Sequence, residues 1–524
     1  MFQEGFILPP TKLVREGELN NDLVGILAAN SRVPHLNWGD IRAEMAALAV
    51  SRTRMQELIG RYGAAAIEKG IDGVLAYSER QARSVIEQVP DGTYTFSDYL
   101  EADFGGRPAL PIRIKLDLVI SGSEMTLDFT HTDPQVAFAL NLVTHGRAGH
   151  NMVVPALVNY FRTRIPDITY NSGMMRPVHM VVPRGSLLNP EPRAPVGARQ
   201  ATMFRVPEVI MGALAQAVPD HIPACGGGQG AIMFVSAPEF ETGQSRVSIL
   251  QPLIGGSGGR PGADGIDGVD FVAGFYRNIP TEVLENDAPI LIERYGLRED
   301  GGGPGTARGG LGLDYPLRVL SPRATATCRG MERMFFRPWG RQGGHPGTQG
   351  FARVTRSDST VEVLDKIDVL EMRPGDMLEL GTPCGAGFGD PLARPVEMVA
   401  ADIANGFVSE VAGRELYGVV LGEGAVDTAA TEQLRGRLGR ERPPLPDFAQ
   451  GPERAGFEAC WTDEVQEAVN AAAWTQPAGI RGIIRDLLQQ ELRPRLEAGE
   501  RLDSGTIAAV ASDLVAGLRG RLYR

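Results

Sequence analysis

The sequence predicts an α+β chain with three parts: a mainly helical N-terminal segment, a β-rich and glycine-rich body, and a helical C-terminal tail. Three observations support this prediction. Apolar residues recur with helical spacing before residue 90, and the period changes to two between residues 107 and 129. From Ala231 onward, short apolar runs alternate with glycine-rich turns, and helical spacing returns at the end of the chain.

The N-terminal segment is predicted to hold three helices. The first is a short amphipathic helix over residues 21–30. Asp40 can cap the second, and a third is predicted over residues 73–89, before the turn Pro90-Asp91-Gly92. The apolar residues of the second helix approximate one stripe: Ile41, Met45, Leu48, Met55, Leu58 and Ile59.

The body is predicted to begin with a β-hairpin, whose turn is Ser121-Gly122-Ser123. Helices are predicted over residues 148–164 and 206–217, with a strand at 176–183 between them. The residues that alternate on one face of the hairpin are Ile112, Ile114, Leu116 and Leu118. Six later strands are predicted at IMFVSA, SRVSILQPLI, APILIERYGL, YPLRVL, ATATCR and DMLELG, and two helices at VEMVAADIANG and EVAGRELYGVVL.

A proline-rich segment, residues 441–453, is the best candidate for a linker. Three helices are predicted beyond it, at EVQEAVNAAAW, GIRGIIRDLLQQELRPRLEAG and GTIAAVASDLVAGLRGRLYR. Because each is apolar on one face, they must pack on the main body or on a partner. The predicted divisions are 1–106 (mainly helical), 107–422 (α+β body), 423–453 (linker) and 454–524 (helical extension).

Composition excludes several classes of protein. The net charge of −12 gives no basis for binding nucleic acid or an anionic membrane. The four cysteines form no CxxC pair, so a zinc ribbon or redox dithiol is unsupported and reduced core cysteines are expected. With neither a signal-peptide pattern nor a run of 18 apolar residues, the chain is expected to be cytoplasmic.

The 65 glycines are not periodic, and their clustering is typical of tight turns in a folded catalytic protein. No GxxxxGK[ST] occurs, so no P-loop ATP site is expected. Residues 385–389 (GAGFG) superficially resemble a dinucleotide loop. Their final spacing is wrong and Asp390-Pro391 blocks continuation into a helix, which favours a turn.

Two sets of residues are candidates for a substrate pocket. His145 and His150 are five apart, a spacing that does not place them on one helix face, so capping or pocket roles are favoured over metal binding. The glycine-rich stretch 253–270 carries Arg260, Asp264 and Asp267. Such a stretch can approach a ligand closely, or it can be a compact interface loop locked by an Arg–Asp pair; both interpretations stay open.

The loop and helix of residues 186–220 carry Arg199, Thr202 and Arg205 near the helix start. A helix N-terminus exposes free N–H groups and favours anions. Two arginines and a threonine there would suit a carboxylate, a phosphorylated intermediate or bicarbonate. The alternative is a solvated loop whose arginines pair with acids.

Several blocks, in order along residues 1–422, resemble the hydantoinase B/oxoprolinase family. They include FQEGFILPPTKLVREGELNNDL, NSRVPHLNWGDIRAEMAA, SLLNPEPRAPVGARQATMFRVPEVIMGALAQAVPD, GGSGGRPGADGIDGVD, RPWGRQGG and TPCGAGFGDPL. The resemblance implies a partner A subunit of actin-like ATPase fold, which holds ATP and magnesium. That subunit phosphorylates a cyclic amide (a hydantoin, 5-oxoproline or a lactam), or the enol of a ketone in the carboxylase branch.

The resemblance further implies that the B subunit receives the activated intermediate. Water then completes ring opening, or carbon dioxide derived from bicarbonate completes carboxylation. We therefore expect a subunit of a cyclic-amide hydrolase, with a C–C-bond-forming ketone carboxylase as the first alternative and a non-catalytic scaffold as the second. The residues expected to be catalytic are Arg199, Thr202 and Arg205, and those expected in a substrate pocket are His145, His150, Arg260, Asp264 and Asp267.

Two departures from the family pattern qualify this expectation. Family members usually carry an N-terminal metal-binding region with an HxxD motif, and no HxxD occurs here. We therefore expect this chain to bind no cofactor or metal; a divalent metal would come from a separate polypeptide, unless the reading frame is truncated. The family loop GNxETSQR corresponds to residues 198–205, where only Thr202 and Arg205 match, which favours an anionic or more apolar substrate than a hydantoin.

Overall fold

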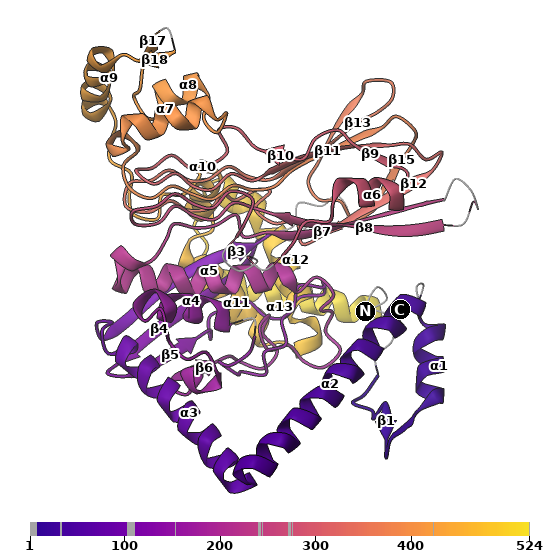
Figure 1. The fold of residues 1–524 in the computed structure, drawn as a ribbon. Coiled ribbons are helices and arrows are strands. Elements are labelled where there is room, and N and C mark those ends of the chain that lie inside the picture. The colour runs from indigo at the N-terminus through magenta and orange to yellow at the C-terminus, as the bar shows by residue number, and fades with distance from the viewer. Residues whose placement is uncertain are drawn as a thin grey trace. The chain divides into compact units, whose positions relative to one another are not determined.

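The computed structural model confirms the α+β prediction, with helices at both ends and sheets between them (Figure 1). It describes residues 8–31, 34–101, 111–151, 153–238, 243, 245–270, 274, 276–422 and 424–522. The chain forms two compact units, residues 1–84 with 167–177 and residues 85–166 with 178–524. Within the described ranges, no helix is both long enough and apolar enough to cross a membrane. The domain boundary predicted after residue 106 falls within residues 102–110, which are not among the described residues. The boundary predicted after residue 422 is next to residue 423, which is not described either.

The first unit is built from helices and one short hairpin. Its elements are β1 (Val14–Arg15), β2 (Glu18–Leu19), α1 (Asn21–Ala29), α2 (Pro34–Tyr62), most of α3 (Ala64–Ile86) and the 3₁₀ turn η1 (Ser172–Met175). The Asn20 side chain caps α1 by accepting from Leu23 N at 3.1 Å. The predicted start of the second helix after Asp40 was wrong, because α2 begins at Pro34, a residue well suited to a first helical turn. The third helix begins at Ala64, earlier than predicted, directly after Gly63 with φ +81°.

The second unit opens with a four-stranded sheet in the order β3-β4-β5-β6. Its strands are β3 (Gly92–Leu100), β4 (Ile112–Ser121), β5 (Glu124–Asp128) and β6 (Val178–Val181). The predicted hairpin is confirmed as β4–β5, and its alternating isoleucines and leucines are buried. Strand β3 was not predicted; it pairs along its whole length with β4. Helices α4 (Val154–Arg164) and α5 (Gln200–Ala217) follow, and α5 packs on β3 and β4 (Figure 1).

Two further sheets share one apolar core. One has the order β15-β12-β7-β8; the other has the order β10-β11-β16-β13-β14, with β9 also paired to β11. All six predicted strand regions lie in these sheets. Their bounds are β7 (Gly230–Pro238), β8 (Ser245–Ile254), β9 (Ile290–Ile292), β10 (Gly296–Leu297), β11 (Leu313–Val319), β12 (Ala324–Arg329), β13 (Phe351–Thr355), β14 (Val361–Leu364), β15 (Leu370–Met372) and β16 (Met377–Gly381), with α6 (Thr281–Asp287) between β8 and β9. Alternate residues of both sheets, such as Met233 and Leu317, interdigitate in the core.

Glycine-rich segments form a layer of extended chains, which we call the glycine layer: residues 224–230, 255–259, 301–312, 340–347 and 383–389. Backbone hydrogen bonds join neighbouring segments, for example Ala386 N to Cys225 O at 2.9 Å and Gly385 N to Gly310 O at 2.8 Å. Most of these glycines do not have a positive φ. The expectation that the glycines serve tight turns was therefore wrong for this layer, including residues 385–389: glycine is needed there because the chains lie too close for a Cβ atom.

The C-terminal part continues from the glycine layer without leaving the second unit. Its elements are the 3₁₀ turn η3 (Pro391–Ala393), α7 (Val396–Ala404), α8 (Glu410–Glu415), β17 (Leu421–Gly422), β18 (Ala425–Val426), α9 (Thr428–Glu441), α10 (Pro452–Cys460), α11 (Asp463–Trp474), α12 (Ala478–Glu497) and α13 (Ser504–Leu522). The predicted linker 423–453 thus contains a full helix, and its Asp447 accepts a hydrogen bond from Arg341 Nε at 2.7 Å. Helices α10–α13 share an apolar core of their own around Leu488 and Ile507.

Ion pairs attach the helical tail to the first sheet of the same chain. On β4, Arg113 pairs with Asp463 and Glu467 of α11, both at 2.7 Å, and Lys115 pairs with the same two carboxylates. Partial burial raises the pKa values of Asp463 and Glu467, but Lys115 and Arg113 outweigh burial and hold both pKa values below the ordinary range. The tail therefore docks on its own chain through charges that depend on ionised carboxylates.

Acid is expected to loosen this attachment. Because the folded-state pKa values of Asp463 and Glu467 are depressed, their contribution to stability is fully present above the unfolded values of about 4 and is lost as the pH falls through the folded values. Hydrogen exchange of α11 at pH 7 and pH 3, corrected for the intrinsic rate, should show a larger loss of protection than in β4. Asp463→Asn with Glu467→Gln should remove most of that difference; an unchanged difference in this variant contradicts the assignment.

Candidate functional site: a buried charge cluster at helix α5

Helix α5 carries the three residues predicted to be catalytic, and the structure separates them. Arg199 occupies the N-cap position and is exposed, with its guanidinium donating to Val196 O at 3.2 Å. Thr202 is fully buried and its hydroxyl donates to Leu140 O, which ties the helix to the loop that precedes α4. Arg205 is also fully buried, one turn further along. Of the three, only Arg199 is accessible to a molecule in solution.

Arg205 lies in a cluster of ion pairs. Its Nη1 donates to Glu208, three residues along α5, and lies 3.6 Å from Asp98 of β3. Its Nε and Nη2 have no hydrogen-bond partner among the described residues, and Nη2 lies 3.7 Å from Glu332. The cluster holds Arg205 inside the protein, so the structure favours a positioning role for it over direct contact with substrate.

Arg333 contacts both carboxylates of the cluster. Its Nη2 donates to Asp98 at 2.6 Å and to Glu208 at 2.9 Å, and all three side chains are no more than 1% exposed. Arg454, at the start of the helical tail, adds a third cation: its Nη1 lies 3.1 Å from Asp98, and its guanidinium stacks 5.0 Å from the ring of Tyr99. The C-terminal tail thereby completes the charge balance around α5.

A second group of charges borders this cluster. The Glu101 carboxylate accepts from the backbone N–H groups of Met334, Phe335 and Phe336 at 2.6–3.0 Å. Lys366 pairs with Glu332 at 2.9 Å. Burial and the neighbouring Glu332 charge raise the pKa of Glu101. These contacts fix the loop that follows Arg333, and with it the position of the Arg333 guanidinium.

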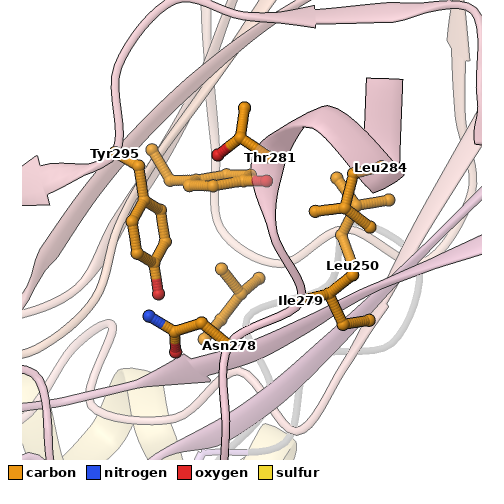
Figure 2. Close-up of a pocket in the computed structure, with 8 residues that line it drawn as sticks. Leu250, Asn278, Ile279, Thr281, Leu284 and Tyr295 are labelled. Atoms are coloured by element: carbon orange, nitrogen blue, oxygen red, sulfur yellow. The ribbon is translucent and has the colours of Figure 1, made fainter. Parts of the chain in front are cut away.

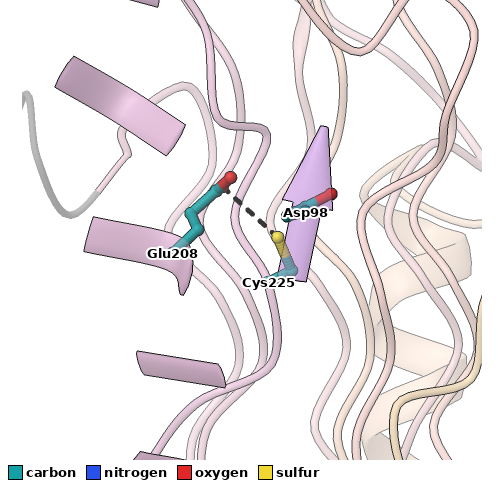
Figure 3. A group of neighbouring side chains, drawn as sticks. All are labelled: Asp98, Glu208 and Cys225. Carbon is teal, nitrogen blue, oxygen red and sulfur yellow. Dashed lines mark hydrogen bonds between the residues drawn. The ribbon is translucent and has the colours of Figure 1, made fainter. Parts of the chain in front are cut away.

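Asp98, Glu208 and Cys225 could in principle hold a metal, because their ligand atoms lie within 4.8 Å of one another (Figure 3). Burial raises the pKa of Asp98, but Arg333, Arg205 and Arg454 outweigh it and keep Asp98 ionised. Burial and the Glu208 charge raise the pKa of the Cys225 thiol, which therefore stays protonated. Three guanidinium groups already neutralise the carboxylates, and a metal would have to displace them. The residues do not suit a metal ion, and we assign none.

The residues predicted for a substrate pocket do not join the α5 cluster. His145, with φ 53°, is exposed and His150 is half-buried; partial burial and the neighbouring His145 lower the pKa of His150. Arg260 is exposed, and its backbone exchanges hydrogen bonds with Ala263 at 3.0 and 3.1 Å. His145 thus lies at the surface, whereas the acidic residues near Arg260 are engaged elsewhere.

Asp264 and Asp267 lock the glycine layer. Asp264 pairs with Arg394 at 2.6 and 2.7 Å, and Asp267 accepts from Arg308 Nη1 at 3.1 Å and from Leu311 N at 2.7 Å. Partial burial raises the pKa of Asp264, but Arg394 outweighs it and the pKa lies below its ordinary value. The sequence left open whether residues 253–270 approach a ligand or form a loop locked by an Arg–Asp pair. The contacts are those of a locked loop, in which the arginines are Arg308 and Arg394 rather than Arg260.

Two pockets bear on where a substrate could bind. The pocket in Figure 2, lined by residues such as Leu250, Asn278 and Tyr295, has a volume of about 20 Å³, which suffices for a water molecule only. A larger pocket, of about 280 Å³, lies between residues 135–137, residues 191–195 and the start of α12. Its wall 191–195 belongs to the loop that leads into Arg199, so it is the better candidate for a small organic substrate.

Comparisons with known proteins place the chain in a family. Residues 1–391 match the family model of hydantoinase B/oxoprolinase proteins. The chain belongs to the hydantoinase B/oxoprolinase family. The caprolactamase subunit beta of Pseudomonas jessenii is 29% identical over 452 residues, which cover 83% of this chain and 75% of that protein. The predicted family resemblance is thereby confirmed.

Solved structures share this fold. The ATP-dependent caprolactamase of Pseudomonas jessenii superposes with a TM-score of 0.71 at 27% identity, covering 83% of this chain and 76% of that chain. Nucleotide-free acetone carboxylase gives a TM-score of 0.74 at 16% identity, covering 97% of this chain and 73% of that one. The second comparison concerns the fold alone. The acetone carboxylase superposition leaves only 3% of this chain uncovered, a much shorter length than the helical tail of residues 454–524. Most of the helical tail therefore belongs to the shared fold.

Proposed function

We propose that this hydantoinase B-type subunit works in a heteromeric, ATP-dependent cyclic-amide hydrolase. Its partner would be an actin-like ATPase subunit that holds ATP and magnesium, and a divalent metal, where one is used, would be held by a separate polypeptide. The observation that carries the proposal is the likeness to caprolactamase in both sequence and fold. That relative is a subunit, which supports a partner for this chain as well.

The proposed reaction divides the chemistry between the subunits. A planar amide is a poor electrophile, so phosphorylation of its oxygen by the partner creates an imidate with phosphate as a leaving group. The B subunit would bind this anionic intermediate while water adds to the imidate carbon and the ring C–N bond breaks, which leaves the amine and an acyl phosphate. A second water then hydrolyses the acyl phosphate to the carboxylate and free phosphate. Arg199, exposed at the N-terminus of α5, is the residue best placed to bind the phosphoryl group, and the 280 Å³ pocket nearby is large enough for the ring.

ATP turnover tests the proposal directly. The chain is co-expressed with a hydantoinase A-type ATPase subunit, the complex is purified, and phosphate release is measured with lactams, 5-oxoproline, hydantoins, and ketones with bicarbonate. Stimulation by cyclic amides, with formation of the ring-opened product, is the expected result. Stimulation by ketone and bicarbonate alone would reject a cyclic-amide hydrolase.

Arg199→Ala is expected to reduce ATP-coupled turnover at least about tenfold while changing the free energy of unfolding by less than about 0.5 kcal/mol. Arg199 is exposed, with one hydrogen bond to its own loop, so its loss should affect ligand binding more than folding. Initial rates of the reconstituted complex and urea unfolding of the chain measure the two quantities. Arg162→Ala, on α4 and also exposed, is the matched control. Equal rates for Arg199→Ala and the wild type would remove Arg199 from the site.

One observation favours a second candidate, an ATP-dependent ketone carboxylase. Acetone carboxylase covers 97% of this chain, including most of the helical tail, whereas caprolactamase covers 83%. At 16% identity this likeness concerns the fold only. The ketone and bicarbonate arm of the same assay decides between the two: carbon-14 from bicarbonate would enter an acid-stable product only in a carboxylase.

A further inference from the structure

The pocket of about 280 Å³ is closed on one side by the helical tail. Residues 478–483, at the start of α12, form that wall, and residues 135–137 and 191–195 form the other two. The tail wall lies beyond residue 391, where the match to the family model ends. The family pattern therefore does not describe this wall of the pocket.

Close contacts hold α12 against the chain that precedes α4. Arg485 is 2% exposed, and its Nε lies 2.7 Å from an Asp133 carboxylate oxygen. One turn earlier, a Cβ atom on Gly482 would lie only 2.5 Å from Gln135 O, so glycine is required for this approach. The position of the tail wall is thus fixed by its own packing.

Side-chain hydrogen bonds join the other two walls to each other. Asn141 is fully buried, and its Nδ2 donates to Val136 O at 2.9 Å and to Pro195 O at 2.8 Å. The Gln135 side chain accepts from Glu191 N at 2.7 Å. Because all three walls are joined in this way, the pocket exists before a ligand binds, and binding needs no rearrangement of the backbone.

The lining of the pocket is mostly apolar and leaves few polar groups for a ligand. Its apolar side chains include Val136, Pro192, Pro195 and Ile483. Among the polar lining residues, Gln135 already binds a backbone N–H group, and Glu191 pairs with Arg184 at 2.8 Å. Arg193 is exposed and forms no ion pair with a described residue. The pocket therefore offers hydrocarbon surface and one available cation.

This chemistry matches a lactam ring better than a hydantoin ring. The methylene groups of a lactam can lie on the apolar walls, while Arg193 supplies a cation for the phosphoryl group of the activated amide. A hydantoin ring carries a second carbonyl and a second N–H group. Both would lie against hydrocarbon without partners, which is costly.

We propose that the pocket holds the hydrocarbon ring of a lactam, and that Gly479 and Ile483 of the tail determine which ring sizes fit. These two residues are four apart, so they lie on one face of α12. A Cβ atom on Gly479 would meet no other atom within 4 Å, and Ile483 is 41% exposed although it is a large apolar residue. The inference rests on the proposed function, because it places the ring of that reaction's substrate.

Gly479→Leu should narrow the pocket. In the complex with the ATPase subunit, we expect kcat/KM for a seven-membered lactam to fall at least about tenfold, with a smaller fall for a five-membered one. Ile483→Ala should shift the preference toward larger rings. Gly505→Leu is the matched control, because Gly505 is the exposed second residue of α13, as Gly479 is of α12, and does not line the pocket. Urea midpoints should not fall in the two leucine variants, since leucine is the better helix former.

Failure of this inference can be distinguished from failure of the proposed function. Turnover of lactams with the same ring preference in Gly479→Leu and the wild type would overturn the inference alone, as would hydantoins turned over as fast as lactams. If the complex turns over no cyclic amide, the proposed function fails, and saturation-transfer NMR of the full chain with the same lactams decides on the pocket. Transfer that is lost in Gly479→Leu and kept in Gly505→Leu supports it. Equal transfer in both, or none to the wild type, overturns it.

Discussion

Arg333→Ala is expected to lower the free energy of unfolding by about 3–5 kcal/mol. Arg333 is fully buried and donates to Asp98 at 2.6 Å and to Glu208 at 2.9 Å. Removing its guanidinium leaves those two carboxylates facing each other with only Arg205 and Arg454 nearby. An uncompensated buried charge is far more costly than the ion pair is stabilising, which is why the effect is large. Urea unfolding, monitored by tryptophan fluorescence and circular dichroism, measures it.

Arg54→Ala is the control for this prediction. Its ion pair with Glu57 is 2.8 Å long, but the side chains are 74% and 56% exposed, so the loss should stay within about 1 kcal/mol. A second variant, Arg333→Ala with Asp98→Asn and Glu208→Gln, removes the unpaired charges and should recover part of the stability. If Arg333→Ala unfolds within 1 kcal/mol of the wild type, the cluster does not stabilise α5.

Local patterns predicted many of the helices and strands, although not β3, and they did not predict the cluster. The i, i+3 spacing of Arg205 and Glu208 on α5 was a signal that could have been recognised as a buried pair. Asp98, Arg333 and Arg454 lie more than 100 residues from α5 along the chain, and nothing local to them marks their meeting. The sequence places two arginines near the start of α5, but which of them faces solvent depends on the helix rotation against β3. That rotation is a property of packing.

The tail shows the same division between local and long-range information. Its amphipathic helices were predicted from apolar spacing, with docking on the body or on a partner left open. In the structure the tail docks on the body of the same chain, where Asp463 pairs with Arg113 and Lys115. Arg454 of the tail also pairs with Asp98. The residue pattern of one helix can show that its apolar face needs a packing partner. The pattern cannot identify that partner, because the charges that complement the tail lie on β4 and β3, more than 300 residues away along the chain.

Glycine density was visible in the sequence, and its purpose was misjudged. A glycine that provides a positive φ and a glycine that permits close approach look alike in a sequence. The backbone hydrogen bonds between residues 224–230, 255–259 and 383–389 distinguish them, since they join chains too close to accommodate side chains. The layer connects α5 and its cluster to the two sheets that share the apolar core around Met233 and Leu317, because residue 225 belongs to both the cluster and the layer. A defect in the layer should therefore affect the whole second unit.

Gly385→Ala tests this and should be the most destabilising of the substitutions considered. A Cβ atom at Gly385 would lie 1.9 Å from Ser257 O and 2.4 Å from Ser257 C, both backbone atoms that cannot move without breaking the layer. We expect a loss of about 4 kcal/mol or more, seen as aggregation on expression or a sharply lower urea midpoint. Gly436→Ala, in α9, is the matched control: the nearest atom there is Arg440 Nη1 at 3.8 Å. Because alanine is the better helix former, it should gain up to about 1 kcal/mol. Equal stability of the two variants would show that the layer can separate to admit a methyl group, and close approach would no longer explain its glycines.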